Sequence, residues 1–312
     1  MDLRALRYFL TVAECGSYSR GSELLRISQP AVSRTIRNLE FELGRPVFHR
    51  RGHGVTLTEA GNILLERSRQ VLRQIEQTKA EIKLGHGGLS GTVSLAVPPA
   101  VGQLFVPPLV ERFARDYPNV SLKIVGGFSG HIHEWLVRSQ VDVACVHDPR
   151  PQKGFLVEPL VLEEVYVVGQ KGAFPNANAM VPADDLAKYP LILPSISHTS
   201  RYLLESLVHS RGIALLPKAE VDDHSVTRAL LVRGQGFSLL TRSAVEADVQ
   251  RGTLELRSVD PSIWWTLSLL TVEHKTSPLV AAVIEALKEI IAALVESGEL
   301  AGRKIWKDSA LT

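Results

Sequence analysis

The chain has 312 residues, of which 45% are hydrophobic, and a formal net charge of +2. This length favours two or three domains with ample apolar material for buried cores. No apolar run approaches the ~18 residues of a membrane helix, and the N-terminus lacks the apolar block of a signal peptide. We therefore expect a cytoplasmic protein without membrane contact, whose distant Cys15 and Cys145 are free thiols.

The charge is distributed unevenly along the chain. Residues 1–91 hold 14 Lys and Arg against 9 Asp and Glu, a net charge of +5, whereas the remainder holds 21 against 24, a net charge of −3. A basic head on a slightly acidic body is typical of a head that meets a polyanion. A merely solvated surface gives the same count.

Three short helices are expected in the head. The first is predicted over residues 2–14, the second ends at Leu25 after a cap at Ser17 or Ser19, and the third follows a cap at Ser28. In the third helix the spacing predicts a buried face, whereas Phe41 does not fit it and is expected to pack against a wing or a following helix. The predicted buried face consists of Val32, Ile36, Leu39 and Leu43. Two helices joined by a few residues form a helix-turn-helix.

The opposite arc of the third helix carries groups that suit duplex DNA. The Gln29 amide can pair with the edge of an adenine, and the Arg34 guanidinium can pair with O6 and N7 of a guanine. Ser33 and the helix N-terminal amides suit phosphate. The remaining candidate contacts are Ser28, Pro30 and Arg37, with Arg50, Arg51 and His53 in a following hairpin. The competing interpretation is a plain three-helix domain with a solvated basic face.

A long helix is predicted from the Thr58 cap to about residue 85. Leu64, Ser68, Val71, Ile75, Thr78 and Ile82 alternate steps of four and three, which is typical of a coiled-coil seam. A lone helix has nothing to cover this stripe, so we expect a partner subunit to contact Leu64, Val71, Ile75 and Ile82. The alternative is packing on the chain's own body. The glycine-rich residues 85–91 are expected to form a hinge.

The body alternates predicted strands and helices. Strands are expected over residues 92–97, 120–127, 141–146, 162–170, 213–217, 236–240 and 264–272, and helices over 106–117, 129–139, 199–211, 223–233 and 278–295. Alternation of this kind predicts a parallel sheet covered by helices. Residues 303–312 are expected to be a frayed tail.

A ligand cleft is expected where strand ends and helix starts converge. The converging loops cover residues 98–103, 128–130, 147–149 and 195–201, with Gln235 at a further edge. Hydroxyls at helix starts suit an anion, and Arg201 suits a carboxylate, so the hypothesis is a small, acidic effector. Plain capping and a surface arginine are the alternatives. The candidate ligand contacts are Pro99, Val101, Gly102, Ser129, His147, Ser197, Thr199, Arg201 and Gln235.

Enzymatic and cofactor chemistry has little support in the sequence. There is no nucleophile elbow, P-loop or dinucleotide fingerprint, and no carboxylate pair stands out. His131 and His133 stand two residues apart, a spacing that diverges on a helix, so no metal site is expected there. We expect no cofactor and no enzymatic activity.

The head resembles the winged helix-turn-helix of LysR-type transcriptional regulators, and the likeness extends over the chain in length and layout. The matching residues are Leu3, Leu6, Phe9, Ser17, residues 28–33, Leu39, Glu40, Leu43, Gly44, Phe48, Arg50 and residues 57–61. Two departures are visible: Gly21 and Ser22 replace two alanines, which suggests a softer second helix, and His53 replaces a wing arginine.

The resemblance implies an α/β fold class with an N-terminal winged helix-turn-helix, a linker helix and a two-lobed, periplasmic-binding-protein-like effector domain. The implied domains are residues 1–58, 59–91 and 92–302, with lobe I over about 92–164 and 266–302 and lobe II over about 165–265. It also implies that Gln29, Pro30, Ser33, Arg34 and Arg50 contact double-stranded operator DNA. The implied assembly is a homodimer or homotetramer that also meets RNA polymerase. The competing class is a two-lobed small-molecule-binding protein whose head serves mainly as a dimerisation module.

Overall fold

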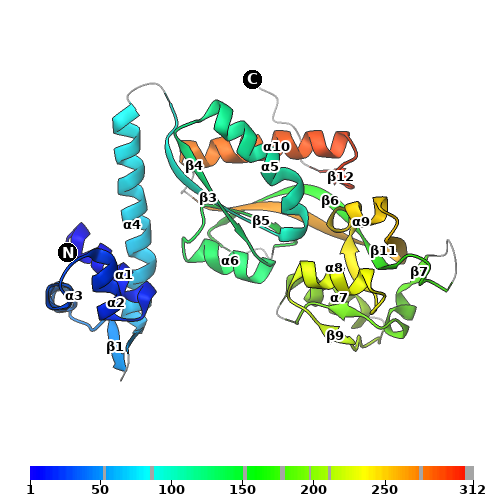
Figure 1. Ribbon diagram of the computed structural model, residues 1–312, viewed down its shortest axis with the longest axis horizontal. Helices are drawn as coiled ribbons and strands as arrows, with labels where there is room; N and C mark the ends of the chain where they lie inside the picture. The colour runs from blue at the N-terminus through cyan, green and yellow to red at the C-terminus, as the bar shows by residue number, and fades with distance from the viewer. Residues whose placement is uncertain are drawn as a thin grey trace. The chain divides into compact units, whose positions relative to one another are not determined.

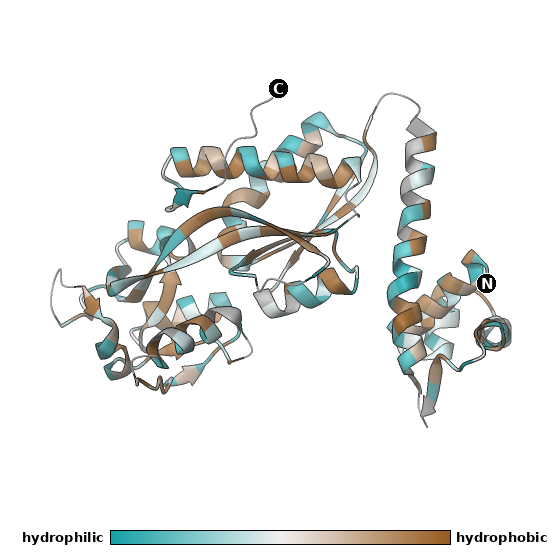
Figure 2. Ribbon diagram, turned by 180° about the vertical axis from the view of Figure 1, so that it is seen from behind, coloured by the Kyte–Doolittle hydropathy of each residue, from teal (hydrophilic) through white to brown (hydrophobic). Residues whose placement is uncertain are grey.

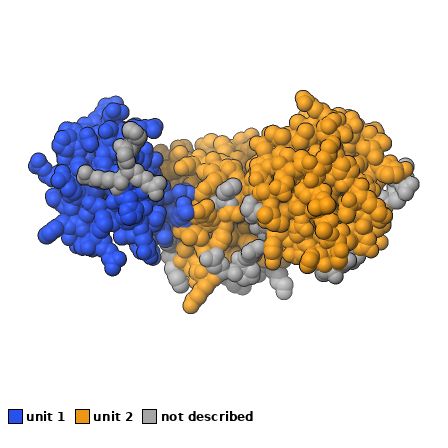
Figure 3. Space-filling model, turned by 90° about the horizontal axis from the view of Figure 1, so that it is seen from below, with its two compact units in different colours: residues 1–91, 138–140 blue, residues 92–137, 141–312 orange. Residues whose placement is uncertain are grey.

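The computed structural model describes residues 1–51, 54–84, 88–149, 153–175, 180–196, 198–209, 212–273 and 277–305. The chain divides into two compact units, which are described separately (Figure 3). Unit 1 consists of residues 1–91 and 138–140, and unit 2 consists of residues 92–137 and 141–312.

Unit 1 contains a winged helix-turn-helix and a long helix. Its elements are α1 (Leu3–Cys15), α2 (Tyr18–Leu25), α3 (Gln29–Leu43), β1 (Phe48–Arg51), β2 (Gly54–Leu57) and α4 (Glu59–Leu84). The helices lie within a few residues of the expected spans. Their shared core contains Phe9, Val12, Val32, Ile36 and Leu39, all at most 2% exposed.

Local capping explains where these helices begin and end. The Asp2 carboxylate accepts a hydrogen bond from the Ala5 N–H at 2.6 Å, which caps α1. Gly16 and Gly44 adopt left-handed backbone angles after α1 and α3, a conformation that stops a helix. Ser28 occupies the N-cap position of α3 in an extended conformation, but its side chain makes no capping hydrogen bond.

The end of α3 differs from the expectation. Phe41 is 90% exposed and Leu43 is 41% exposed, so Phe41 packs against neither the wing nor another helix among the described residues, and Leu43 is not buried. Each residue advances about 100° around a helix, so Phe41 lies about 200° from the buried Leu39 and faces away from the core.

Unit 2 is a two-lobed α/β body (Figure 1). Lobe I carries β3 (Gly91–Val97), α5 (Pro99–Asp116), β4 (Val120–Gly126), α6 (Ser129–Val137), β5 (Val143–His147), α10 (Pro278–Glu296) and β12 (Arg303–Lys304). Lobe II carries β7 (Val181–Pro182), the 3₁₀ helix η2 (Ala183–Lys188), β8 (Ile192–Leu193), α7 (Thr199–His209), β9 (Ala219–Glu220), α8 (His224–Val232), β10 (Ser238–Thr241), η3 (Arg242–Ala244) and α9 (Glu246–Gln250).

Two long strands run through both lobes. They are β6 (Phe155–Gln170) and β11 (Leu254–Val272), and they pair antiparallel along most of their lengths. The sheet order is β10-β6-β11-β5-β3-β4. The expected parallel sheet is correct only in part: β3 and β5 run parallel, but β11 pairs antiparallel with both β5 and β6.

Three other expectations about the body require correction. Helix α5 begins at Pro99 instead of near residue 106, because proline is tolerated in a first helical turn, and Pro107 and Pro108 lie inside the helix. Residues 213–217 form no strand; the short β9 lies just beyond them. Part of the expected tail is ordered, since Arg303 and Lys304 pair with β6.

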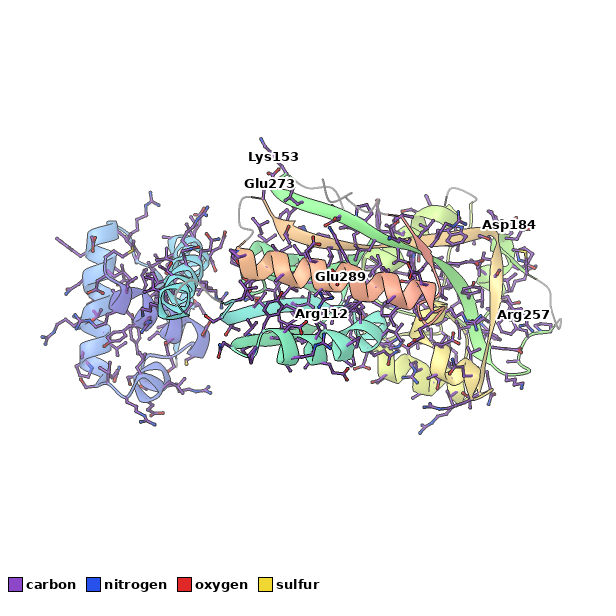
Figure 4. All side chains as sticks on the ribbon, turned by 90° about the horizontal axis from the view of Figure 1, so that it is seen from above. Arg112, Lys153, Asp184, Arg257, Glu273 and Glu289 are labelled. Carbon is purple, nitrogen blue, oxygen red and sulfur yellow. The ribbon has the colours of Figure 1, made fainter. Side chains whose placement is uncertain are left out.

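Helices cover both faces of lobe I. Figure 1 shows α5 and α10 on one face of the sheet and α6 on the other. An ion pair joins α5 to α10, with Arg112 Nη1 2.5 Å from Glu289 Oε2 (Figure 4). Figure 2 shows hydrophobic residues along the central strands, where β5 is buried from Val143 to Val146. Within the described part of the chain, no helix has the length and apolar character needed to cross a membrane.

Candidate DNA interface and ligand cavity

The candidate DNA-contacting residues of α3 lie on its exposed arc. Gln29, Pro30, Arg34 and Arg37 are exposed, as is the preceding Ser28, and Ser33 is half-buried. The opposite side of α3 is buried in the head. We call this outward surface the recognition face: residues 28, 29, 30, 33, 34 and 37. It presents amide, hydroxyl and guanidinium groups on one side of a single helix.

The Glu40 carboxylate fixes α3 against the wing, the hairpin formed by β1 and β2. Its Oε1 accepts hydrogen bonds from the N–H groups of Val47, at 2.8 Å, and Phe48, at 3.4 Å. Thr58 holds the other end of the hairpin, because its Oγ1 donates to the Pro46 carbonyl at 2.7 Å. These contacts set the wing relative to the recognition face. Glu40 matched a family position, but the sequence did not indicate its backbone partners.

The wing is held to α1 as well. The Val55 N–H donates to the Gly16 carbonyl at 2.8 Å, and Arg50 pairs with Val55 across the hairpin. The backbones of Arg50 and Arg51 belong to β1, but their side chains lie outside the described part of the structure. His53 lies outside the described residues altogether.

The predicted seam on α4 separates into two parts. Leu64 is 8% exposed and packs within the head's own core, so its assignment to a subunit interface is wrong; its partners lie in the head and not in the body, which was the alternative. Val71 is 43% and Ile82 is 75% exposed, and Ile75 is half-buried. The second half of α4 thus presents an uncovered apolar stripe within unit 1.

A cavity of about 110 Å³ lies in unit 2 between residues of both lobes. Three of the predicted ligand contacts, Pro99, His147 and Arg201, line it. Its wall is largely apolar and includes Pro98, Ala100, Phe128, Leu193, Pro194, Leu204, Val221, Leu239, Leu240, Ala244 and Trp265. Its remaining lining residues are His198, His224, Thr227, Ser238 and Thr241.

The other predicted ligand contacts are not brought to this cavity among the described side chains. Val101 and Gly102 are buried inside lobe I because α5 already begins at Pro99. Gln235 is exposed and lies outside the lining. Ser129 and Thr199 begin α6 and α7, but their side chains are not described, and Ser197 lies outside the described residues.

A buried network of side-chain hydrogen bonds lies beside the cavity. Glu163 on β6 is fully buried; its Oε2 lies 2.9 Å from His147 Nε2, and its Oε1 accepts from the Ser243 hydroxyl. Ser243 in turn lies 2.9 Å from the Thr241 hydroxyl. This network joins β5 of lobe I to η3 of lobe II through Glu163 on β6. Its one sign in the sequence is that Glu163 stands between apolar residues that alternate along β6.

Arg201 is buried, with only 5% of its side chain exposed. Its guanidinium contacts Glu205 on the next turn of α7, with Nε 2.7 Å from Oε1, and it donates to the carbonyls of Pro194 and Leu215. A ligand carboxylate at this position would have to displace Glu205. The i, i+4 spacing of residues 201 and 205 is the sequence sign of this pairing.

His198 and His224 also line the cavity, although neither is among the predicted ligand contacts. His198 Nε2 lies 3.0 Å from Asp222 Oδ1, and its ring packs edge-on against Phe128 at 4.4 Å between centroids. His224 Nε2 donates to the Ala244 carbonyl at 3.1 Å, and burial lowers the pKa of His224. No cluster of three or more His, Cys, Asp or Glu residues that suits a metal ion occurs in the described part of the chain.

A winged helix-turn-helix with an exposed basic face, followed by a long helix and a two-lobed α/β body, defines the class of DNA-binding transcriptional regulators. The chain belongs to the LysR family: the model "Bacterial regulatory helix-turn-helix protein, lysR family" matches residues 3–62, and the model "LysR substrate binding domain" matches residues 86–292. The predicted family and fold class are thereby confirmed.

Relatives and solved structures agree with this assignment. The chain is 30% identical over 277 residues to the transcriptional regulator BbuR of Bordetella bronchiseptica, covering 88% of this chain and 85% of the relative. It is 29% identical over 299 residues to the nitrogen assimilation regulatory protein Nac of Escherichia coli, covering 95% and 97%. Both relatives are transcriptional regulators, and no enzyme family is indicated.

Two full-length structures share the fold. A variant of OxyR from Pseudomonas aeruginosa has a TM-score of 0.71 at 24% identity, covering 93% of this chain and 94% of that chain. CbnR complexed with its target DNA has a TM-score of 0.66 at 21% identity, covering 93% and 100%.

Proposed function

We propose that this regulator reads paired operator half-sites as a dimer or tetramer and changes its operator affinity when a small molecule occupies the cavity of unit 2. In this proposal the head covers residues 1–58, the linker 59–91 and the two-lobed regulatory domain 92–302, and the protein acts in the cytoplasm without enzymatic activity. RNA polymerase is a further proposed partner. The recognition face is the observation that carries the proposal.

The proposed DNA contacts divide into two groups by chemistry. Gln29 and Arg34 reach base edges, because an amide pairs with adenine and a guanidinium with guanine O6 and N7. Ser28, Ser33 and Arg37 contact phosphates, together with Arg50, Arg51 and His53 of the wing. The anchoring of the wing by Glu40 and Thr58 supports this division, because it holds both groups in one fixed arrangement.

Arg34→Ala tests base reading. A good bidentate pair contributes about 1–3 kcal/mol, so specific binding to an operator selected from genomic fragments should weaken roughly 5–150-fold, while nonspecific binding changes little. Arg233→Ala, which removes an exposed arginine from unit 2, is the matched control. Footprints that are identical for both variants would refute the role of Arg34. Wild-type affinity should also fall steeply with salt if several phosphates are neutralised.

The uncovered stripe on α4 is the proposed subunit contact, formed by Val71, Ile75 and Ile82. Ile82→Lys should weaken self-association in sedimentation, because it places a charge in an apolar seam. Ile63→Lys makes the same change at a position that is 60% exposed on the same helix but off the stripe. Equal association of the two variants would argue against this stripe.

A gel shift separates the proposal from the competing class. A two-lobed binding protein with a head used only for dimerisation would not shift its own upstream DNA, and Arg34→Ala would then have no effect.

A further inference from the structure

We infer that the cavity of unit 2 takes an uncharged molecule of about one ring in size, with an apolar body and a hydroxyl group. This inference rests on the proposed use of the cavity as the effector site and specifies its ligand. It departs from the acidic effector suggested by the sequence. Four observations support it: the cationic groups already face carboxylates, α5 begins with prolines, the remaining polar groups are neutral, and the cavity is small.

Arg201, His147 and His198, which line the described cavity, each already face a carboxylate of the protein. Arg201 is held by Glu205 and two carbonyls, and Glu220 Oε1 lies 3.8 Å away. His147 faces Glu163 at 2.9 Å, and His198 faces Asp222 at 3.0 Å. An anion that entered would compete with these carboxylates instead of meeting a free positive charge. Burying an unpaired charge is strongly unfavourable.

The start of α5 offers fewer donors to an anion than an ordinary helix start. A helix N-terminus binds anions through its free N–H groups. Here Pro98 and Pro99 occupy the cap and first helical positions, and both line the cavity. Because proline lacks an N–H, pyrrolidine rings replace two of the four free N–H groups of an ordinary helix start, and those of Ala100 and Val101 remain.

The polar groups left available are neutral. His224 donates from Nε2 to a carbonyl, which can only accept, so its Nδ1 is an acceptor in the neutral ring. The Ser238 hydroxyl has no hydrogen-bond partner among the described residues and both donates and accepts. A ligand hydroxyl matches such a set because it too both donates and accepts.

The volume and the wall of the cavity suit a single ring. A cavity of about 150 Å³ lined by Leu, Ile and Phe holds benzene. The cavity here has about 110 Å³ and a largely apolar wall, so its volume is of the order that a single ring needs. Phe128, Trp265 and the leucines of lobe II supply the surface against which such a ring packs.

Three probes of nearly equal size separate the parts of this inference on the full-length protein. Phenol has a ring and a hydroxyl, fluorobenzene has the ring without a donor, and benzoate has the ring and a negative charge. Binding is measured by saturation-transfer NMR and by titration calorimetry at neutral pH. Ala100→Leu fills the cavity from the first turn of α5, and Ala114→Leu makes the same change on the exposed side of that helix.

Phenol should bind, Ala100→Leu should weaken it at least tenfold, and Ala114→Leu should leave it unchanged. Fluorobenzene should bind several-fold more weakly, and benzoate should show no binding that Ala100→Leu removes. If Ala100→Leu fails to fold by circular dichroism, Val221→Leu fills the cavity from lobe II. Benzoate binding that is tight and sensitive to the filling variant would overturn the ligand class while leaving the effector site intact. Equal binding of fluorobenzene and phenol would contradict the inference that the cavity recognises a hydroxyl group. Insensitivity of all three probes to filling would overturn the cavity as a ligand site, and with it the proposed effector function.

Discussion

Glu163 offers a direct test of how the two lobes are held together. Its fully buried carboxylate contacts His147 and Ser243, which belong to different lobes. We compare Glu163→Leu, which keeps the side-chain volume but removes both acceptors, with Glu163→Gln, which keeps one acceptor and adds a donor.

The expected magnitudes follow from the hydrogen bonds. Each buried polar group that loses its partner costs about 1–3 kcal/mol, so Glu163→Leu should destabilise unit 2 by roughly 2–6 kcal/mol. In Glu163→Gln the amide oxygen accepts from Ser243, and the amide N–H donates to His147 Nε2 once that ring carries its proton on Nδ1. The amide substitution should therefore cost less than about 1 kcal/mol.

Tryptophan fluorescence during urea unfolding is the appropriate assay. All four tryptophans follow residue 134, so their signal reports unit 2 and not the helix-turn-helix. A shift of the midpoint at constant slope gives the change in unfolding free energy. The reasoning would be refuted if Glu163→Gln were as damaging as Glu163→Leu, since the charge would then matter and not the number of acceptors. A loss below 1 kcal/mol for Glu163→Leu would equally contradict it.

Three further outcomes are expected. Gly61→Ala should lower the free energy of unfolding of the head by about 1–3 kcal/mol, because an added Cβ would lie 2.1 Å from the Val47 carbonyl oxygen. Circular dichroism should show this as a lower melting temperature, and an unchanged melting temperature would contradict this packing. Burial and the hydrogen bond to Glu164 raise the pKa of Tyr166 to about 12, so its stabilising contribution is complete below pH 10 and lost as the pH rises through 12; ultraviolet titration should show a late tyrosine that Tyr166→Phe removes. Burial raises the pKa of the Cys145 thiol, so a thiol reagent should modify the half-buried Cys15 in the native protein and Cys145 only after unfolding, and fast native modification of both would contradict this.

The head was largely predictable because its determinants are local. The caps at Asp2 and Ser17 and the spacing of the apolar residues each act within a few positions of the chain. One inference from composition was incomplete: Gly21 suggests a soft helix, yet an added Cβ there would lie 2.9 Å from Val12 Cγ2. The glycine permits a close approach of α1 and α2 that no local rule reveals.

The cavity was harder to predict because its parts come from distant segments. Glu163 meets His147 across 16 residues of sequence and Ser243 across 80, and no periodicity links such positions. The expected Arg201 does reach the cavity; its i, i+4 spacing to Glu205 is visible in the sequence, but the burial that makes this pairing compete with a ligand is not. The start of α5 was not predictable from the prolines alone, because proline suits a loop as well as a first helical turn.

Lobe I is assembled from both ends of the body's sequence. Its strands β3, β4 and β5 precede residue 148, whereas β11 and α10, which complete its sheet and cover it, follow residue 253. During synthesis on the ribosome, the early strands of lobe I therefore wait until the chain has passed through all of lobe II. A premature stop anywhere before residue 278 would leave the face of α5 that packs on α10 uncovered, which makes truncated products of this gene natural targets for chaperones and proteases.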